Sequence, residues 1–172
     1  LDCTIVDSRG DPADAVPAAQ QMLATTSNLI AIVDADSGVL TSTVPLFNQA
    51  KVPDMSVGGD VPFDKNKYPY FWRTIPGDDV NGYALAAYVK FRTPYTKVAS
   101  MFANDQAAQG NVPGLAAGAK TLGLSVPITE SLAVDQQTYE TEIQRMKSAG
   151  TQVLASETYP QTAGVLFGEM KQ

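Results

Sequence analysis

Two short stretches of small and polar residues carry the side chains and backbone best suited to binding a ligand. Ser37 and Gly38 follow one predicted strand, and Gly58, Gly59 and Asp60 follow the next. A serine hydroxyl beside the backbone N–H groups of a helix start is suited to binding a carboxylate. Glycines let the backbone approach a ligand closely. Because parallel strands end at the same edge of a sheet, we expect both stretches to face one ligand.

Both stretches also have purely structural explanations, which the sequence leaves open. Ser37 and Gly38 are typical of a cap on the helix predicted over residues 41–50. Gly58 and Gly59 are typical of a turn that requires a positive φ angle.

Most catalytic chemistries lack their residues in this chain. There is no histidine, which excludes Ser-His-Asp and Cys-His catalysis and removes the commonest metal ligand. No phosphate-binding loop of the Walker type and no GxGxxG follows a predicted strand. Asp34 and Asp36 are interpreted as solvated loop residues, because no histidine or further acid lies near them. We therefore predict no metal site and no cofactor, and a Rossmann-type enzyme is disfavoured.

Charge and composition narrow the class further. The net charge of −6 argues against a nucleic-acid partner, because phosphate binding needs clustered cations and Lys65, Lys67 and Arg73 are scattered. With 44% hydrophobic residues in a length of 172, the chain can bury a core. No apolar run approaches the roughly 18 residues of a membrane span. The single cysteine, Cys3, cannot form an internal disulfide and is predicted to be buried in a strand.

Apolar segments that could form strands alternate with helical segments along the whole chain. This alternation predicts an α/β fold with right-handed βαβ units and parallel sheets. The helix at residue 12 is predicted from Asp11 as N-cap and Pro12 at the first helical position. Strands are expected at about residues 3–6, 29–33, 53–57, 70–75, 97–103, 125–129 and 152–156. Helices are expected at about residues 12–26, 41–50, 80–91, 107–122, 139–149 and 160–171.

A break at Pro76 and Gly77 suggests two lobes. A fresh series of strands and helices follows these two residues, so we predict one lobe over residues 1–75 and a second over 76–172. The alternative from the same pattern is one continuous sheet of about seven strands.

Five segments form a collective pattern in this order along the chain: VDSRGDPADAVPAAQQMLA, AIVDADSG, VPDMSVGGD, FWRTIPGDDVNGYALAAYV and KVASMFANDQAAQGNVPGLAAGAKTLG. No single segment is specific, but together they resemble the type I periplasmic solute-binding proteins of the branched-chain amino acid transport class. The resemblance implies two Rossmann-like lobes that close on a small ligand, with a hinge near residues 74–77.

The resemblance also implies a ligand site. Ser37 matches a serine whose hydroxyl binds the ligand carboxylate, with the backbone of Gly38 assisting. Gly58, Gly59 and Asp60 match a loop that contacts the head group of the ligand.

In the second lobe, Tyr159 matches an aromatic residue that covers the ligand, although the pattern alone favours an ordinary loop tyrosine. Ala107 stands where the family has an aromatic ring, and Ala108 where it has a glycine. Loss of the ring enlarges the site, which argues against a branched-chain aliphatic ligand. Asp60 is charged where the family is small or hydroxylated, so it could pair with a ligand amine or reject a second carboxylate.

The role implied by the resemblance is the periplasmic or cell-surface binding component of an ABC importer. Its partners would be an amino acid or other small carboxylate and a membrane permease. The alternative is an effector-sensing domain of a regulator or receptor with the same fold. In the family, a first strand and helix precede the point that matches Leu1, and further lobe-two strands follow the point that matches Gln172. We therefore expect a proteolysed or truncated piece, or a chain that completes its sheets with a complementing chain or fragment.

Overall fold

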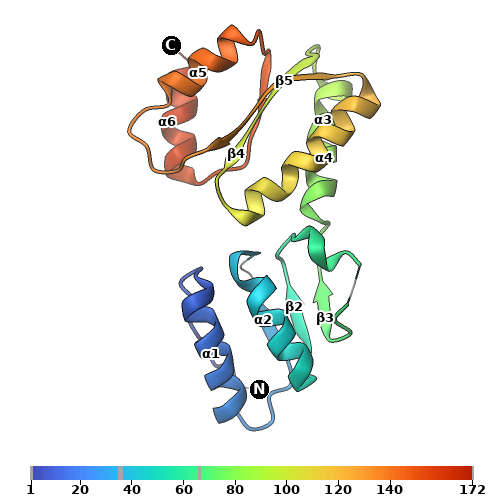
Figure 1. Ribbon diagram of the computed structural model, residues 1–172, viewed down its shortest axis with the longest axis vertical. Helices are drawn as coiled ribbons and strands as arrows, with labels where there is room; N and C mark the ends of the chain where they lie inside the picture. The colour runs from blue at the N-terminus through green and yellow to red at the C-terminus, as the bar shows by residue number, and fades with distance from the viewer. Residues whose placement is uncertain (1, 35–36, 66, 172) are drawn as a thin grey trace. The chain divides into compact units, whose positions relative to one another are not determined.

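The computed structural model describes residues 2–34, 37–65 and 67–171. The chain divides into two units, Leu1–Gly77 and Asp78–Gln172, each with its own sheet and helices (Figure 1). The described strands form two three-stranded sheets rather than one continuous sheet. All strand pairs are parallel, as the alternation of strands and helices predicts.

In the first unit, helices and strands alternate around a sheet of order β1-β2-β3. Its elements are α1 (Pro12–Thr25), β1 (Ile32–Asp34), α2 (Ser37–Ala50), β2 (Asp54–Ser56), the 3₁₀ turn η1 (Val61–Phe63) and β3 (Phe71–Arg73). α1 and α2 lie side by side (Figure 1). The Asp11 carboxylate accepts a hydrogen bond from the Ala13 N–H at 2.8 Å, so the predicted cap of α1 is confirmed.

One face of this first sheet is buried and the other is exposed. Ile32, Asp54 and Phe71 are register partners on one face, and all three are buried. Apolar side chains of α2 pack around the two hydrophobic members of that row: Leu40, Val44 and Phe47. The next row, Val33, Met55 and Trp72, points to the other face, because side chains alternate along a strand. These three side chains are exposed.

The strand predicted at residues 3–6 is absent, and Cys3 is exposed rather than buried. The apolar, β-branched composition suggested a strand, but a strand also needs a hydrogen-bonded neighbour. Within the described part of the chain, no backbone hydrogen bond joins residues 3–6 to another segment. Ile5 is consequently 93% exposed. Both predictions were wrong.

The second unit is built on a sheet of order β5-β4-β6. Its elements are α3 (Asp78–Arg92), β4 (Lys97–Ala103), α4 (Gln106–Leu122), β5 (Ser125–Leu132), α5 (Glu140–Ser148), β6 (Val153–Ala155) and α6 (Pro160–Met170). The sheet separates α3 and α4 from α5 and α6 (Figure 1). One core, which includes Phe102 and Leu115, lies on the α3 and α4 side. The other, which includes Met101 and Leu166, lies on the α5 and α6 side.

Local signals set the limits of α4. The Asp105 carboxylate caps its start, accepting the Ala108 N–H at 2.9 Å. Gly123 ends it at φ 70°, the left-handed conformation that favours glycine, as predicted. Pro113 lies inside this helix.

The contact between α3 and α4 depends on the absence of side chains. A Cβ atom on Gly114 would lie 1.8 Å from the backbone oxygen of Asp79. A Cβ on Gly82 would lie 2.0 Å from the backbone oxygen of Asn111. The two helix backbones are therefore too close for any other residue at either position.

Candidate functional site

Ser37 and the loop 58–60 lie at one edge of the first sheet, where β1 and β2 end. We call Ser37, Gly58, Gly59 and Asp60 the first-unit edge. Ser37 is the first residue of α2, so this helix begins four residues earlier than predicted. The reason is that Val39 and Leu40 are buried and extend the apolar face of the helix toward its N-terminus. Gly38 lies half-buried in the first turn, and Asp36 falls outside the described residues.

The structure brings Ser37 and Gly58 together. A Cβ atom on Gly58 would lie 3.1 Å from the Ser37 Oγ and 2.2 Å from the Leu40 Cδ1. Gly58 does not have a positive φ, so the interpretation of a turn that requires one is wrong for this residue. The glycine is needed because the β2–η1 loop passes close to the start of α2. Gly59 and Asp60 continue this loop and are buried.

Two residues that the sequence reasoning did not select hold the loop. The Ser56 Oγ accepts the Gly58 N–H at 2.9 Å, so this N–H already has a partner within the loop. Arg73 donates from Nη1 to the Asp60 carbonyl at 3.0 Å. The signal for Ser56 was its position directly before the glycines. For Arg73 the signal was a cation in an otherwise apolar strand, which the charge argument had set aside.

A second buried carboxyl group lies on the strand that leads to this loop. Asp54 is 1% exposed, and among the described residues neither of its carboxyl oxygens has a hydrogen-bond partner. Burial, with a smaller contribution from the nearby Asp34 carboxylate, raises the pKa of Asp54 from its ordinary value of 3.8 to about 7. Asp34 ends β1 and accepts a hydrogen bond from the Thr43 hydroxyl at 3.2 Å. Its interpretation as a solvated loop residue was therefore wrong.

The predicted second-lobe residues lie where β4 and β6 end. Ala107 is half-buried in the first turn of α4, and Tyr159 caps the start of α6 with 49% of its surface exposed. The buried Asn111 side chain ties these regions together, donating to the Ala107 carbonyl at 3.4 Å and to Glu157 Oε2 at 2.8 Å. We call Ala107, Asn111, Glu157 and Tyr159 the second-unit edge. Sequence reasoning missed Asn111 and Glu157, although Glu157 stands two residues before the selected tyrosine.

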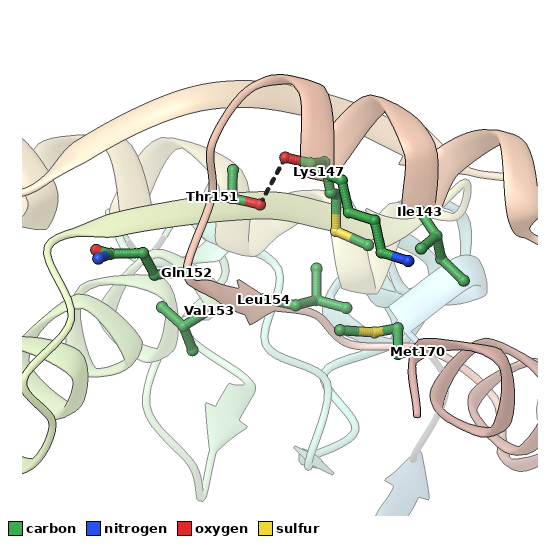
Figure 2. Close-up of a pocket in the computed structure, with 8 residues that line it drawn as sticks. Ile143, Lys147, Thr151, Gln152, Val153, Leu154 and Met170 are labelled. Carbon is green, nitrogen blue, oxygen red and sulfur yellow. Dashed lines mark hydrogen bonds between the residues drawn. The ribbon is translucent and has the colours of Figure 1, made fainter. Parts of the chain in front are cut away.

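Two cavities among the described residues contain no predicted site residue. Figure 2 shows one of about 110 Å³ between α5, β6 and the end of α6, where Lys147 and Met170 lie beside the strand. Its Thr151 hydroxyl is used within the fold, since it donates to the Met146 carbonyl at 3.0 Å. The other, of about 100 Å³, lies between α1, β1 and α2. Both are small beside ligand pockets of roughly 300–1,000 Å³.

The arrangement at the two edges is suited to binding rather than to catalysis. The first-unit edge offers a hydroxyl and a close backbone, and the second-unit edge an exposed phenol ring and an amide–carboxylate pair. Among the described residues, no three His, Cys, Asp or Glu side chains are grouped in a way that could hold a metal ion. In the same residues, no helix has the length and apolar character needed to cross a bilayer.

Comparison with known proteins finds a matching family and solved structures with a similar fold. A family model described as periplasmic binding protein matches residues 1–172. Comparison with curated protein sequences finds no match.

Three of the solved structures similar to this chain are solute-binding or ABC transporter proteins. A leucine-binding protein of Thermotoga maritima has a TM-score of 0.85 at 16% identity, over 99% of this chain and 49% of its own. A branched-chain amino acid ABC transporter protein of Thermus thermophilus with bound valine has a TM-score of 0.89 at 14% identity, over 99% and 44%. A solute-binding protein of R. palustris in complex with benzoate has a TM-score of 0.81 at 15% identity, over 96% and 46%. This chain therefore spans a little under half the length of these proteins.

Proposed function

Since the chain belongs to the periplasmic binding protein family, we propose that it is the substrate-binding part of an ABC importer and binds an amino acid or a related small carboxylate. Membership confirms the predicted α/β fold with parallel sheets. It also identifies the chain as a binding protein rather than an enzyme, with an extracytoplasmic location. Our proposal goes further on three points: the ligand class, the permease as partner, and the choice between periplasm and cell surface.

The observation that carries the proposal is the approach of Ser37 to Gly58. The Ser37 hydroxyl lies against Gly58, at the carboxyl ends of two parallel strands. This is the edge of a sheet where α/β proteins bind ligands. The bulk of Leu40 behind the glycine keeps the two residues in place. A carboxylate that accepts a hydrogen bond from Ser37 would gain the strength of a charge-assisted bond. Valine and benzoate, the ligands of two similar proteins, are both carboxylates.

The second-unit edge favours a ligand bulkier than valine. Ala107 places only a methyl group in the first turn of α4, so space is available where the family has an aromatic ring. Tyr159 is 49% exposed and supplies one ring that can stack on a ligand. Aromatic acids fit this combination better than branched aliphatic amino acids.

We further propose that binding closes the two lobes about residues 74–77 and that the closed form engages a membrane permease. Ligand contacts made only in the closed form would shift the population toward it. Tyr159, whose side chain is exposed, is the residue that we propose makes such a contact.

Thermal unfolding of the 172-residue chain with valine, leucine, benzoate and 4-hydroxybenzoate tests the proposal. A ligand at 100 times its Kd stabilises a protein by about 2.7 kcal/mol, which is easily measured. Ser37→Ala is expected to weaken binding by roughly tenfold or more, because a hydrogen bond to a charged group is lost. Ser42→Ala is the matched control, since Ser42 lies on the same helix and donates to the Val39 carbonyl. Absence of stabilisation by every carboxylate, or equal effects of the two variants, would refute the carboxylate site.

A further inference from the structure

We propose that Arg73 is the positioning residue of the first-unit edge, because it fixes the loop 58–60 to the segment that follows β3. The positioning itself is a property of this unit alone. Its consequence for ligand affinity rests on the proposed function.

Three bonds from the Arg73 guanidinium carry this inference. Nη1 donates to the Asp60 carbonyl at 3.0 Å, and Nε donates to the Ile75 carbonyl at 3.1 Å. Nη2 forms an ion pair with the Asp64 carboxylate. The side chain is 16% exposed and that of Asp64 is 30% exposed, so water screens the ion pair only in part. One guanidinium thus joins the end of the β2–η1 loop at Asp60, and Asp64 just after η1, to the exit of β3.

The loop needs such a restraint. Gly58 and Gly59 have no side chains to pack, and glycine loses more conformational freedom on folding than any other residue. Ser56 holds the start of the loop through the Gly58 N–H. Arg73 holds its end, because the Asp60 carbonyl that it binds also accepts the Phe63 N–H of η1 at 3.2 Å.

Arginine is specifically suited to this task. Its planar guanidinium presents five N–H donors in a rigid fork, so three acceptors in different directions can be bound at once. A lysine ammonium is a point charge on a flexible stem and cannot reproduce that geometry. Arg73 is also the register partner of Ser56, so the residues that hold the two ends of the loop face the same side of the sheet.

The bond to Ile75 extends the role of Arg73. Ile75 lies two residues before the end of the first unit at Gly77. Displacement of the Asp60 carbonyl by a ligand would therefore pull on the guanidinium and, through it, on residues 74–77. Arg73 thus couples the position of the binding loop to the segment proposed as the hinge.

Hydrogen exchange of the full chain, read by mass spectrometry, tests the positioning without any ligand. In Arg73→Met, the backbone amides of residues 57–64 are expected to exchange roughly tenfold faster or more, because the hydrogen bonds from the charged guanidinium are lost. Arg73→Lys is expected to recover little of the protection, and Asp64→Asn to lose less, since the two carbonyl bonds remain. Arg9→Lys is the control: Arg9 pairs with Asp14 at 3.8 Å with 74% of its side chain exposed.

Two patterns of exchange in Arg73→Met would overturn the inference, and so would one result for Arg73→Lys. One is unchanged exchange in residues 57–64, and the other is an increase spread evenly over α1, α2 and β2, which marks a merely structural role. Full recovery of protection by Arg73→Lys would also contradict it, because charge alone would then suffice.

The consequence for binding is measured separately, with benzoate and valine as probes. Arg73→Met and Arg73→Lys are expected to weaken binding of the probe that stabilises the wild type by about tenfold. Wild-type affinity in both variants, with faster loop exchange, would refute a role in ligand positioning. If neither probe binds the wild type, the proposed carboxylate function fails, while the exchange result still decides the positioning by Arg73.

Discussion

Replacing Gly114 by alanine tests the closest backbone contact of the second unit. The new Cβ would lie 1.8 Å from the Asp79 oxygen and 2.5 Å from the Asp79 carbonyl carbon. Both atoms belong to the backbone of α3, so no side-chain rotation can relieve the clash. One of the two helices has to move, and the glycine contacts along the rest of the α3–α4 interface move with it.

The magnitude follows from two opposing effects. Overpacking of a tight interior costs typically about 1–3 kcal/mol, and a backbone clash of this depth belongs at the upper end. Alanine returns about 1 kcal/mol, because it is the better helix former. The net loss is roughly 2 kcal/mol of unfolding free energy. For a unit of this size that corresponds to a fall in Tm of about 10 °C.

The chain supplies its own control for this experiment. Gly164 lies in α6 of the same unit, and a Cβ there would meet no atom within 4 Å. Gly164→Ala is therefore expected to raise the stability of the second unit by up to about 1 kcal/mol, through helix propensity alone.

Thermal and guanidinium unfolding followed by circular dichroism measure both variants. Trp72 is the one tryptophan of the sequence and lies in the first unit, so its fluorescence serves as an internal reference. The reasoning is refuted if Gly114→Ala is as stable as the wild type, or if the two alanine variants shift Tm in the same direction.

Substitutions at three further positions test Asp54, the first-unit edge and the start of α4. The raised pKa of Asp54, about 7, means that the folded chain keeps a proton that the unfolded chain releases above its ordinary value of 3.8. The contribution of protonated Asp54 to the free energy of unfolding is complete below about pH 4 and falls by up to roughly 4 kcal/mol as pH rises to about 7. Asp54→Asn is expected to flatten this dependence of the unfolding free energy on pH, as measured by urea unfolding. An unchanged pH dependence in this variant would contradict the prediction. Gly58→Ala places a methyl group 2.2 Å from the Leu40 Cδ1. This variant is expected to lower the free energy of unfolding by about 1–3 kcal/mol and to weaken carboxylate binding. A variant that melts and binds like the wild type would contradict the prediction. Asp105→Ala removes the acceptor of the Ala108 N–H and should cost about 1 kcal/mol in thermal melts, whereas Asp105→Asn should retain most of it.

Elements whose signals are local could be predicted closely. The strand at residues 97–103 was predicted at the bounds observed for β4, and α4 ends before Gly123 as expected. The cap of α1 at Asp11 was also recognised. In each case the information lies within a few neighbouring residues: an apolar run, a capping side chain or a glycine able to adopt a left-handed φ.

Predictions that depended on a partner elsewhere in the chain were less secure. The apolar run at residues 3–6 was predicted as a strand, but it finds no hydrogen-bonded neighbour among the described residues. The start of α2 was placed at residue 41 instead of Ser37, since the capping signal was read without the burial of Leu40 that lengthens the helix. Strand pairing and burial are properties of segments that meet only in the folded chain.

The sequence by itself determined the class of this protein: parallel α/β units, a family, and the two polar stretches at strand ends. Only the tertiary structure explains why particular residues occupy those stretches and their surroundings. Gly58 is glycine because Leu40 and Ser37 pack against it, and Asp54 holds a proton near neutral pH because the sheet and α2 bury it. Arg73, set aside as a scattered charge, donates a hydrogen bond to the Asp60 carbonyl of the loop 58–60. The physical reason is that close approach, desolvation and a shared hydrogen-bond donor arise only between residues distant in sequence.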